Sequence, residues 1–162
     1  MQILICGPLD IAVNCAGIAG GYATDENMLD DWRRIPSVNL DGVWLCQRAE
    51  IQQMLTQESL DPAPRGNRGV IVNVASILGF IGGSPDTAAV AYTSSKHGVM
   101  GMTRTDAIMY TPRGIRINAI CLGYIDTPML GNVEVQHIIA DEVKKCPQHW
   151  GRWRKLLTVL LS

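Results

Sequence analysis

The stretch Gly69-Val-Ile-Val-Asn-Val-Ala75 is the clearest strand signal in the sequence, and Ser76 follows it directly. β-Branched residues fill this stretch, and neither proline nor a charged residue interrupts it, so we predict a buried β-strand there. Two further apolar runs predict strands at residues 11–14 and 115–122. Each predicted strand is short and ends in small or polar residues, which is typical of strands in a compact sheet.

Helical patterns separate the predicted strands, one that starts at about Trp32 or Val38 and ends at Met54, and one over residues 92–110. Two further helical pieces are predicted at residues 133–145 and 152–161. Strands that alternate with helices form parallel sheets with right-handed crossovers. We therefore predict an α/β fold with a parallel sheet of about three core strands and helices on both faces. The side chains that we expect to be buried in this sheet are Val70, Val72, Val74, Ile117 and Ala119.

The carboxyl ends of the three predicted strands share one chemical character. Residues 14–17, Ser76 and residues 123–127 are small or polar, and each group follows one of the strands. In open parallel sheets, ligands bind beyond the carboxyl ends of the strands. The sequence therefore predicts one functional rim built from these three segments.

Tyr92 and Lys96 lie four residues apart in the predicted helix, so they are expected to share one helix face. A phenol has an ordinary pKa near 10 and is a weak acid at neutral pH, but a neighbouring cation favours the phenolate. Ser76 would hold a carbonyl or alcohol oxygen at the same place, while Tyr92 gives or takes its proton. These three residue types predict proton-transfer chemistry at the rim.

Length and composition exclude several other classes of function. The chain has 162 residues, of which 47% are hydrophobic and 18% charged, and a net charge of −1. We therefore expect residues 1–162 to form a single globular domain that binds no nucleic acid and, lacking a long apolar run, does not enter a membrane. Five cysteines without regular spacing, and no recognisable signal peptide, favour the cytoplasm. Metal is not expected, because Cys146 with His149 makes only one candidate ligand pair.

Five features resemble motifs of the short-chain dehydrogenase/reductase family, in the family's order. They are Asn14-Cys-Ala-Gly17, Val38-Asn-Leu-Asp-Gly42, Ser76, the Tyr92 and Lys96 pair, and Asn118-Ala-Ile-Cys-Leu-Gly-Tyr-Ile-Asp-Thr-Pro128. The resemblance runs through most of the chain and implies a Rossmann-like sheet. It also implies an NAD- or NADP-dependent oxidoreductase that interconverts a secondary alcohol and a ketone, with a small carbonyl or alcohol substrate, and a homo-oligomer at full length.

The resemblance assigns a role to each catalytic residue. Tyr92 is the implied proton donor and acceptor, and Ser76 holds the substrate oxygen. Lys96 holds the nicotinamide ribose and lowers the pKa of the phenol, while Asn39 supports a water relay to Lys96. The hydride comes from the cofactor, because no side chain can supply it. The implied cofactor-binding residues are Asn14, Ala16, Gly17, Tyr92, Lys96, Gly123, Ile125 and Thr127.

The sequence also departs from the family pattern. No Gly-rich turn precedes Asn14, although that turn brings backbone amides to the pyrophosphate of the cofactor. The sequence ends within what resembles the last helix before the family's seventh strand, and Leu122 replaces the usual proline of the family's Pro-Gly pair. We therefore expect a truncated domain, inactive by itself, in preference to a minimal enzyme. A non-catalytic dehydrogenase-like interaction protein stays as the alternative, and neither the substrate nor the choice of NAD or NADP can be read from the sequence.

Overall fold

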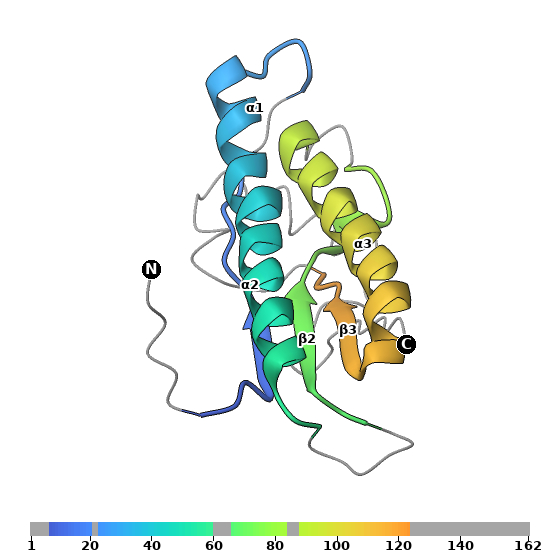
Figure 1. Cartoon of the computed structure of the whole chain (residues 1–162). Coiled ribbons are helices and arrows are strands. Elements are labelled where there is room, and N and C mark those ends of the chain that lie inside the picture. The colour runs from blue at the N-terminus through green and yellow to red at the C-terminus, as the bar shows by residue number, and fades with distance from the viewer. Residues whose placement is uncertain (1–6, 21–22, 60–65, 84–87, 124–162) are drawn as a thin grey trace.

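The structure is a computed structural model that describes residues 7–20, 23–59, 66–83 and 88–123. Along the described chain, two consecutive α-helices separate the first β-strand from the second, and a third α-helix separates the second strand from the third (Figure 1). The elements are β1 (Ile11–Asn14), α1 (Leu29–Pro36), a π-helical turn η1 (Ser37–Gly42), α2 (Val43–Thr56), β2 (Gly69–Val74), a 3₁₀ turn η2 (Ile77–Gly79), α3 (Val90–Tyr110), a 3₁₀ turn η4 (Thr111–Arg113) and β3 (Ile115–Ile120).

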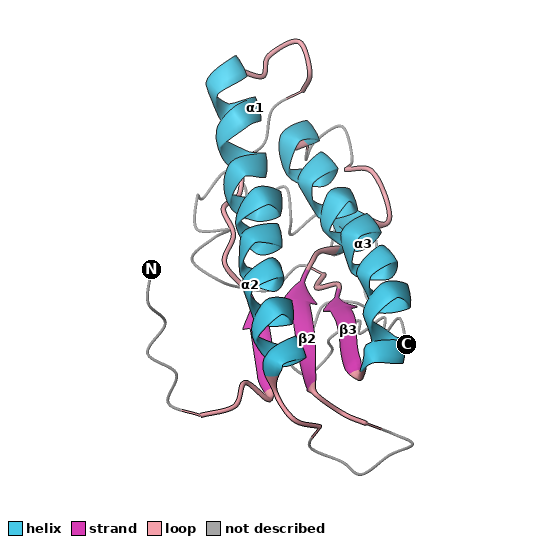
Figure 2. Ribbon diagram, viewed as in Figure 1, coloured by secondary structure: helices cyan, strands magenta, loops and turns pink. Residues whose placement is uncertain are grey.

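The three strands form one parallel sheet in the order β1-β2-β3 (Figure 2). Ile11 lies opposite Val70 in the first pair, and Val70 lies opposite Arg116 in the second. The prediction of a parallel three-stranded core is therefore confirmed, with strand ends within two residues of those expected. Gly114 takes a φ of 83° at the turn into β3, a conformation that favours glycine.

The predicted helix over residues 32–54 begins earlier, at Leu29, and ends at Thr56. It is continuous in space but changes to a π-helical turn between α1 and α2 (Figure 1). Pro36 lies just before this turn and has no N–H for the regular helical ladder. The π turn carries Asn39 and buries it completely, so the irregular segment is also the one that presents a site residue.

One face of the sheet is covered by α2 and α3, which both contact it (Figure 1). Ile71, Ile117 and Ala119 are buried on this face, as expected for the last two. The prediction was wrong for Val70, Val72 and Val74, which are only half-buried. Side chains alternate between the two faces of a strand, so these valines point away from α2 and α3.

Within the described residues the helices cover one face of the sheet, so the helices predicted on the other face are not found there (Figure 1). The predicted helical pieces at 133–145 and 152–161 lie outside the described residues. Within the described part of the chain, no helix is long and apolar enough to cross a membrane.

Candidate active site

Ser76 lies immediately beyond the carboxyl end of β2 and is buried. Its side chain accepts a hydrogen bond from the backbone N–H of Leu78 at 3.2 Å, which caps the η2 turn. A capping serine of this kind has a fixed rotamer, because the turn depends on the position of its hydroxyl. The predicted serine therefore sits at the rim in a defined orientation.

Tyr92 and Lys96 lie in the first two turns of α3 and converge on Ser76. The phenol of Tyr92 makes a hydrogen bond with the side chain of Ser76. The Lys96 ammonium lies 5.6 Å from the centre of the Tyr92 ring and donates a hydrogen bond to the Val74 carbonyl oxygen at 2.9 Å. The structure thus brings together the serine, tyrosine and lysine that the sequence singled out.

The electrostatics of this cluster differ from the expectation. Burial raises the pKa of Tyr92, and the hydrogen bond with Ser76 offsets only part of that effect. Burial also lowers the pKa of Lys96, although the nearby Cys121 thiol acts in the opposite direction. The expected lowering of the Tyr92 pKa by Lys96 is therefore wrong for this structure. The free energy lost when the phenolate is removed from water exceeds the stabilisation that the phenolate gains from its surroundings.

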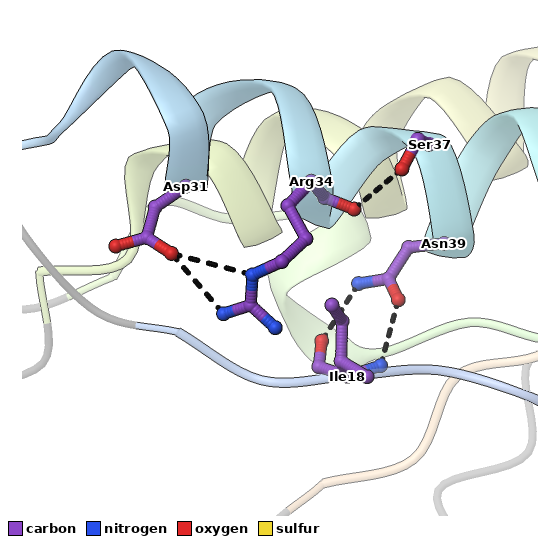
Figure 3. A network of polar contacts seen from close by, with 5 residues as sticks. All are labelled: Ile18, Asp31, Arg34, Ser37 and Asn39. Atoms are coloured by element: carbon purple, nitrogen blue, oxygen red, sulfur yellow. Dashed lines mark hydrogen bonds and ion pairs between the residues drawn. The ribbon is translucent and has the colours of Figure 1, made fainter.

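Asn39 connects the π-helical turn to the loop that follows β1 (Figure 3). Its side-chain N–H₂ donates to the Ile18 carbonyl oxygen at 2.9 Å, and its Oδ1 accepts from the Ile18 backbone N–H at 2.8 Å. The same N–H₂ also donates to Ser95 Oγ at 3.3 Å. Two hydrogen bonds, to the backbone N–H and the backbone carbonyl oxygen of Ile18, hold the loop against the helix. This positioning contact was not part of the water-relay expectation.

Figure 3 also shows polar contacts of α1, the helix that leads into the π-helical turn. Asp31 and Arg34 form an ion pair at 3.1 Å there, and Ser37 donates to the Arg34 carbonyl oxygen at 2.8 Å. The Arg34 side chain is 58% exposed, and exposed pairs of this kind contribute little to stability. We therefore assign these contacts no part in the candidate site.

The loop after β1 presents the predicted cofactor residues in different ways. Ala16 is exposed and Gly17 half-buried, whereas the Asn14 side chain is buried and points into the core. A Cβ at Gly17 would lie 3.3 Å from Asn39 Oδ1 and 3.7 Å from Lys96 Nζ. Glycine at this position therefore lets the loop approach the side chains of Asn39 and Lys96 closely.

These residues fit the nicotinamide ribose end of a dinucleotide. An ammonium has three N–H donors, and within the described residues one of those of Lys96 is used, on Val74. The exposed loop beside it offers backbone groups to a ligand. Gly123 is half-buried beyond β3, whereas Ile125 and Thr127 lie outside the described residues.

A family model for short chain dehydrogenases matches residues 2–137. The chain belongs to the short-chain dehydrogenase family. It is 42% identical over 124 residues to a 3beta-hydroxysteroid dehydrogenase of Mediterraneibacter gnavus, covering 76% of this chain and 40% of that protein. It is 37% identical over 134 residues to a cyclohexanol dehydrogenase of Acinetobacter sp., covering 82% of this chain and 49% of that protein. The chain spans about half the length of the curated relatives it matches, or less.

Solved structures of the short-chain dehydrogenase family agree with the fold. A short-chain type dehydrogenase/reductase from Mycobacterium marinum superposes with a TM-score of 0.69 at 30% identity, covering 86% of this chain and 49% of that one. A Beutenbergia cavernae structure with bound NADP, at low occupancy, gives a TM-score of 0.72 at 34% identity and covers 84% and 50%. The family's cofactor is NAD or NADP, and the described residues do not distinguish between them.

Beneath the rim of this short-chain dehydrogenase lies a buried polar network that the sequence analysis missed. Asn14 donates to Asn73 Oδ1 at 3.0 Å, and Asn73 donates to Gln47 at 2.6 Å and to Thr103 at 2.9 Å. Gln47 donates in turn to Asp106 at 2.6 Å. Asn73 in the middle of an apolar strand was the available signal, because a buried amide needs partners. The network ties β1 and β2 to α2 and α3, and so supports the loop that begins after Asn14.

Replacing Glu50 with glutamine is expected to stabilise the protein at neutral pH. Asn14 donates to the Glu50 carboxylate at 3.0 Å, yet burial raises the pKa of Glu50 above its ordinary value of 4.5. The folded protein thus holds this proton more tightly than the unfolded chain, and stability falls as the pH rises through the Glu50 pKa. Glutamine keeps the acceptor and removes the charge.

Urea unfolding at about pH 7 should show a gain of less than about 1 kcal/mol for Glu50→Gln, since the half-exposed carboxylate is partly screened. Below the ordinary carboxyl pKa the gain should vanish, because both states of the unsubstituted protein are then protonated. Glu58→Gln, at an exposed position, is the matched control. An equal gain at both pH values would contradict the explanation.

Proposed function

We propose that this chain carries the catalytic part of an NAD- or NADP-dependent oxidoreductase that interconverts a secondary alcohol and a ketone. The observation that carries the proposal is the convergence of Ser76, Tyr92 and Lys96 at the carboxyl ends of the strands. Phenol, hydroxyl and ammonium in contact at one rim are suited to moving a proton to or from a substrate oxygen.

Each side chain has a separate part in that reaction. Tyr92 gives its proton to the oxygen of a ketone during reduction and takes it back during alcohol oxidation. Ser76, which already makes a hydrogen bond with the phenol, holds the same oxygen. The bound cofactor supplies or accepts the hydride. A phenol with an ordinary pKa near 10 is protonated at neutral pH, and burial raises the pKa of Tyr92 rather than lowering it, so the side chain carries the proton that ketone reduction needs.

The cofactor residues are proposed from their place around this cluster. Lys96 would bind the ribose hydroxyls through its remaining N–H donors and bring a positive charge to the phenol, while Asn39 holds the adjacent loop. The other residues that we propose to line the nicotinamide end are Asn14, through its backbone, with Ala16, Gly17, Gly123, Ile125 and Thr127. The role of Asn39 in a water relay to Lys96 also stays a proposal.

We further propose that the 162 residues form one domain that works in the cytoplasm as part of a homo-oligomer when the remaining family elements are present. Large apolar side chains are exposed on α2 and α3, namely Trp44, Leu45, Ile108 and Met109. Apolar groups gathered on neighbouring helices are typical of a protein–protein interface.

Sedimentation velocity tests this oligomer. The experiment uses a hybrid of the Acinetobacter cyclohexanol dehydrogenase, in which this chain replaces the matching segment of that enzyme. We expect a dimer or larger assembly, and dissociation by the pair of substitutions Leu45→Glu and Ile108→Glu, because each would bury a charge at the interface. A hybrid that sediments as a monomer at micromolar concentration would contradict the proposal.

The same hybrid tests the proposed reaction. NADH or NADPH formation with cyclohexanol, followed by absorbance, reports hydride transfer that depends on the catalytic residues of this chain. An active hybrid that loses its activity when Tyr92 is changed supports the oxidoreductase. A folded hybrid that binds cofactor and turns over nothing would favour the alternative, a non-catalytic dehydrogenase-like interaction protein.

A further inference from the structure

Ser95 is a buried serine next to Lys96, and its hydroxyl has two defined partners. It is 1% exposed. Its Oγ donates to the Tyr92 carbonyl oxygen at 2.6 Å and accepts from the Asn39 side-chain N–H₂ at 3.3 Å. A hydroxyl has one proton, so donating it to Tyr92 leaves the oxygen lone pairs for Asn39. The orientation of the hydroxyl is therefore determined by both partners.

The contact with Tyr92 alone would be unremarkable in a helix, because serine hydroxyls often bond to a carbonyl oxygen one turn earlier. The contact with Asn39 is different, because it leaves α3 and reaches the π-helical turn 56 residues away in the sequence. Asn39 in turn accepts a hydrogen bond from the Ile18 backbone N–H and donates one to the Ile18 carbonyl oxygen. One hydroxyl thus lies between the backbone of the tyrosine and the loop after β1.

We propose that Ser95 is a positioning residue, whose hydroxyl fixes the loop after β1 relative to Tyr92 and Lys96 through the side chain of Asn39. The loop passes so close to these groups that a Cβ on Gly17 would lie 3.3 Å from Asn39 Oδ1 and 3.7 Å from Lys96 Nζ. A change in the Asn39 amide is therefore transmitted directly to the space beside the lysine. The purpose of this arrangement rests on the proposed function, but the contacts can be tested without cofactor or substrate.

Amide hydrogen exchange in the 162-residue chain, measured by NMR, tests whether Ser95 holds the Ile18 backbone in place through Asn39. The Ile18 N–H donates to Asn39 Oδ1, so in the unsubstituted chain it should exchange at least about tenfold more slowly than an unprotected loop amide. Ser95→Ala removes the hydroxyl and should speed Ile18 exchange by about tenfold relative to the Val72 amide in β2. The measured quantity is the ratio of the Ile18 and Val72 exchange rates, because a general loss of stability accelerates exchange at both amides equally.

The phenol of Tyr92 provides a second readout, by ¹³C NMR titration of labelled tyrosine, with Tyr92→Phe used for assignment. Burial raises the pKa of this phenol, so a loosened turn that admits water in Ser95→Ala should lower it toward the ordinary value. Ser94→Ala is the matched control, since Ser94 is exposed on the same helix, and it should change neither readout.

Both readouts bear on the contacts alone, so an oxidoreductase assay that fails leaves this test intact. Selective acceleration at Ile18 with a lowered Tyr92 pKa supports the positioning role. If the Ile18 amide is unprotected in the unsubstituted chain while the Val72 amide is protected, the proposal is overturned, even if Ser95→Ala does not fold. Equal effects of Ser95→Ala and Ser94→Ala would overturn it as well.

Discussion

Replacing Tyr92 with phenylalanine is expected to lower the turnover of cyclohexanol by the hybrid enzyme by about 10²-fold or more. The substitution removes the hydroxyl that makes the hydrogen bond with Ser76 and leaves the half-buried ring in place. The reaction then lacks the group that exchanges a proton with the substrate oxygen. Cofactor binding should change little, because the Lys96 ammonium keeps its hydrogen bond to Val74. Initial rates at saturating cofactor measure the effect.

Tyr110→Phe is the matched control for this loss. Tyr110 lies at the other end of α3, where its ring is 5.5 Å from the Arg113 guanidinium. Removing the Tyr110 hydroxyl should leave turnover within about twofold of the unsubstituted hybrid, as is usual for changes away from a site. If Tyr92→Phe and the unsubstituted hybrid turn over at equal rates, Tyr92 has no part in the mechanism. If both variants lose activity equally, the loss reflects the helix and not the proton donor.

The 162-residue chain by itself is expected to bind NADH and NADPH with dissociation constants no tighter than about 1 mM. The residues that we propose for the ribose end of the cofactor, around Lys96, are present, but the sequence before Asn14 has no Gly-rich turn. Backbone amides at such a turn and the following helix N-terminus make the usual pyrophosphate site. The same chain should show no measurable dehydrogenase activity, although Ser76, Tyr92 and Lys96 are all present.

Fluorescence titration of monodisperse chain with each nucleotide measures this, and the hybrid serves as the positive control. The chain is also expected to be marginally stable or prone to aggregation, because Ile11 is 67% and Val13 55% exposed on the edge strand β1. Micromolar binding of either nucleotide by the chain alone would overturn the prediction and favour a minimal enzyme. Binding only by the hybrid would confirm that the pyrophosphate contacts come from elements outside this sequence.

Local patterns in the sequence were enough to predict the three parallel strands and the cluster at their carboxyl ends. Gly69–Val74 contains four β-branched residues, and Tyr92 and Lys96 share a helix face because helical spacing brings residues four apart together. Parallel strands place their carboxyl ends at one edge, so Ser76 and the start of α3 had to meet there. Each of these inferences depends on periodicity or on one short segment.

What the tertiary structure alone decided are the contacts between segments distant in sequence. The sequence could not show that Val70, Val72 and Val74 point away from the described helices, because that depends on which face α2 and α3 cover. The sequence also could not show that Asn39 accepts a hydrogen bond from the Ile18 backbone N–H. Nor could it show that the Ser95 hydroxyl joins Asn39 to the Tyr92 carbonyl oxygen. The direction of the Tyr92 pKa shift belongs here too, since the sequence supplies the neighbouring charge but only packing determines how much water the phenol loses.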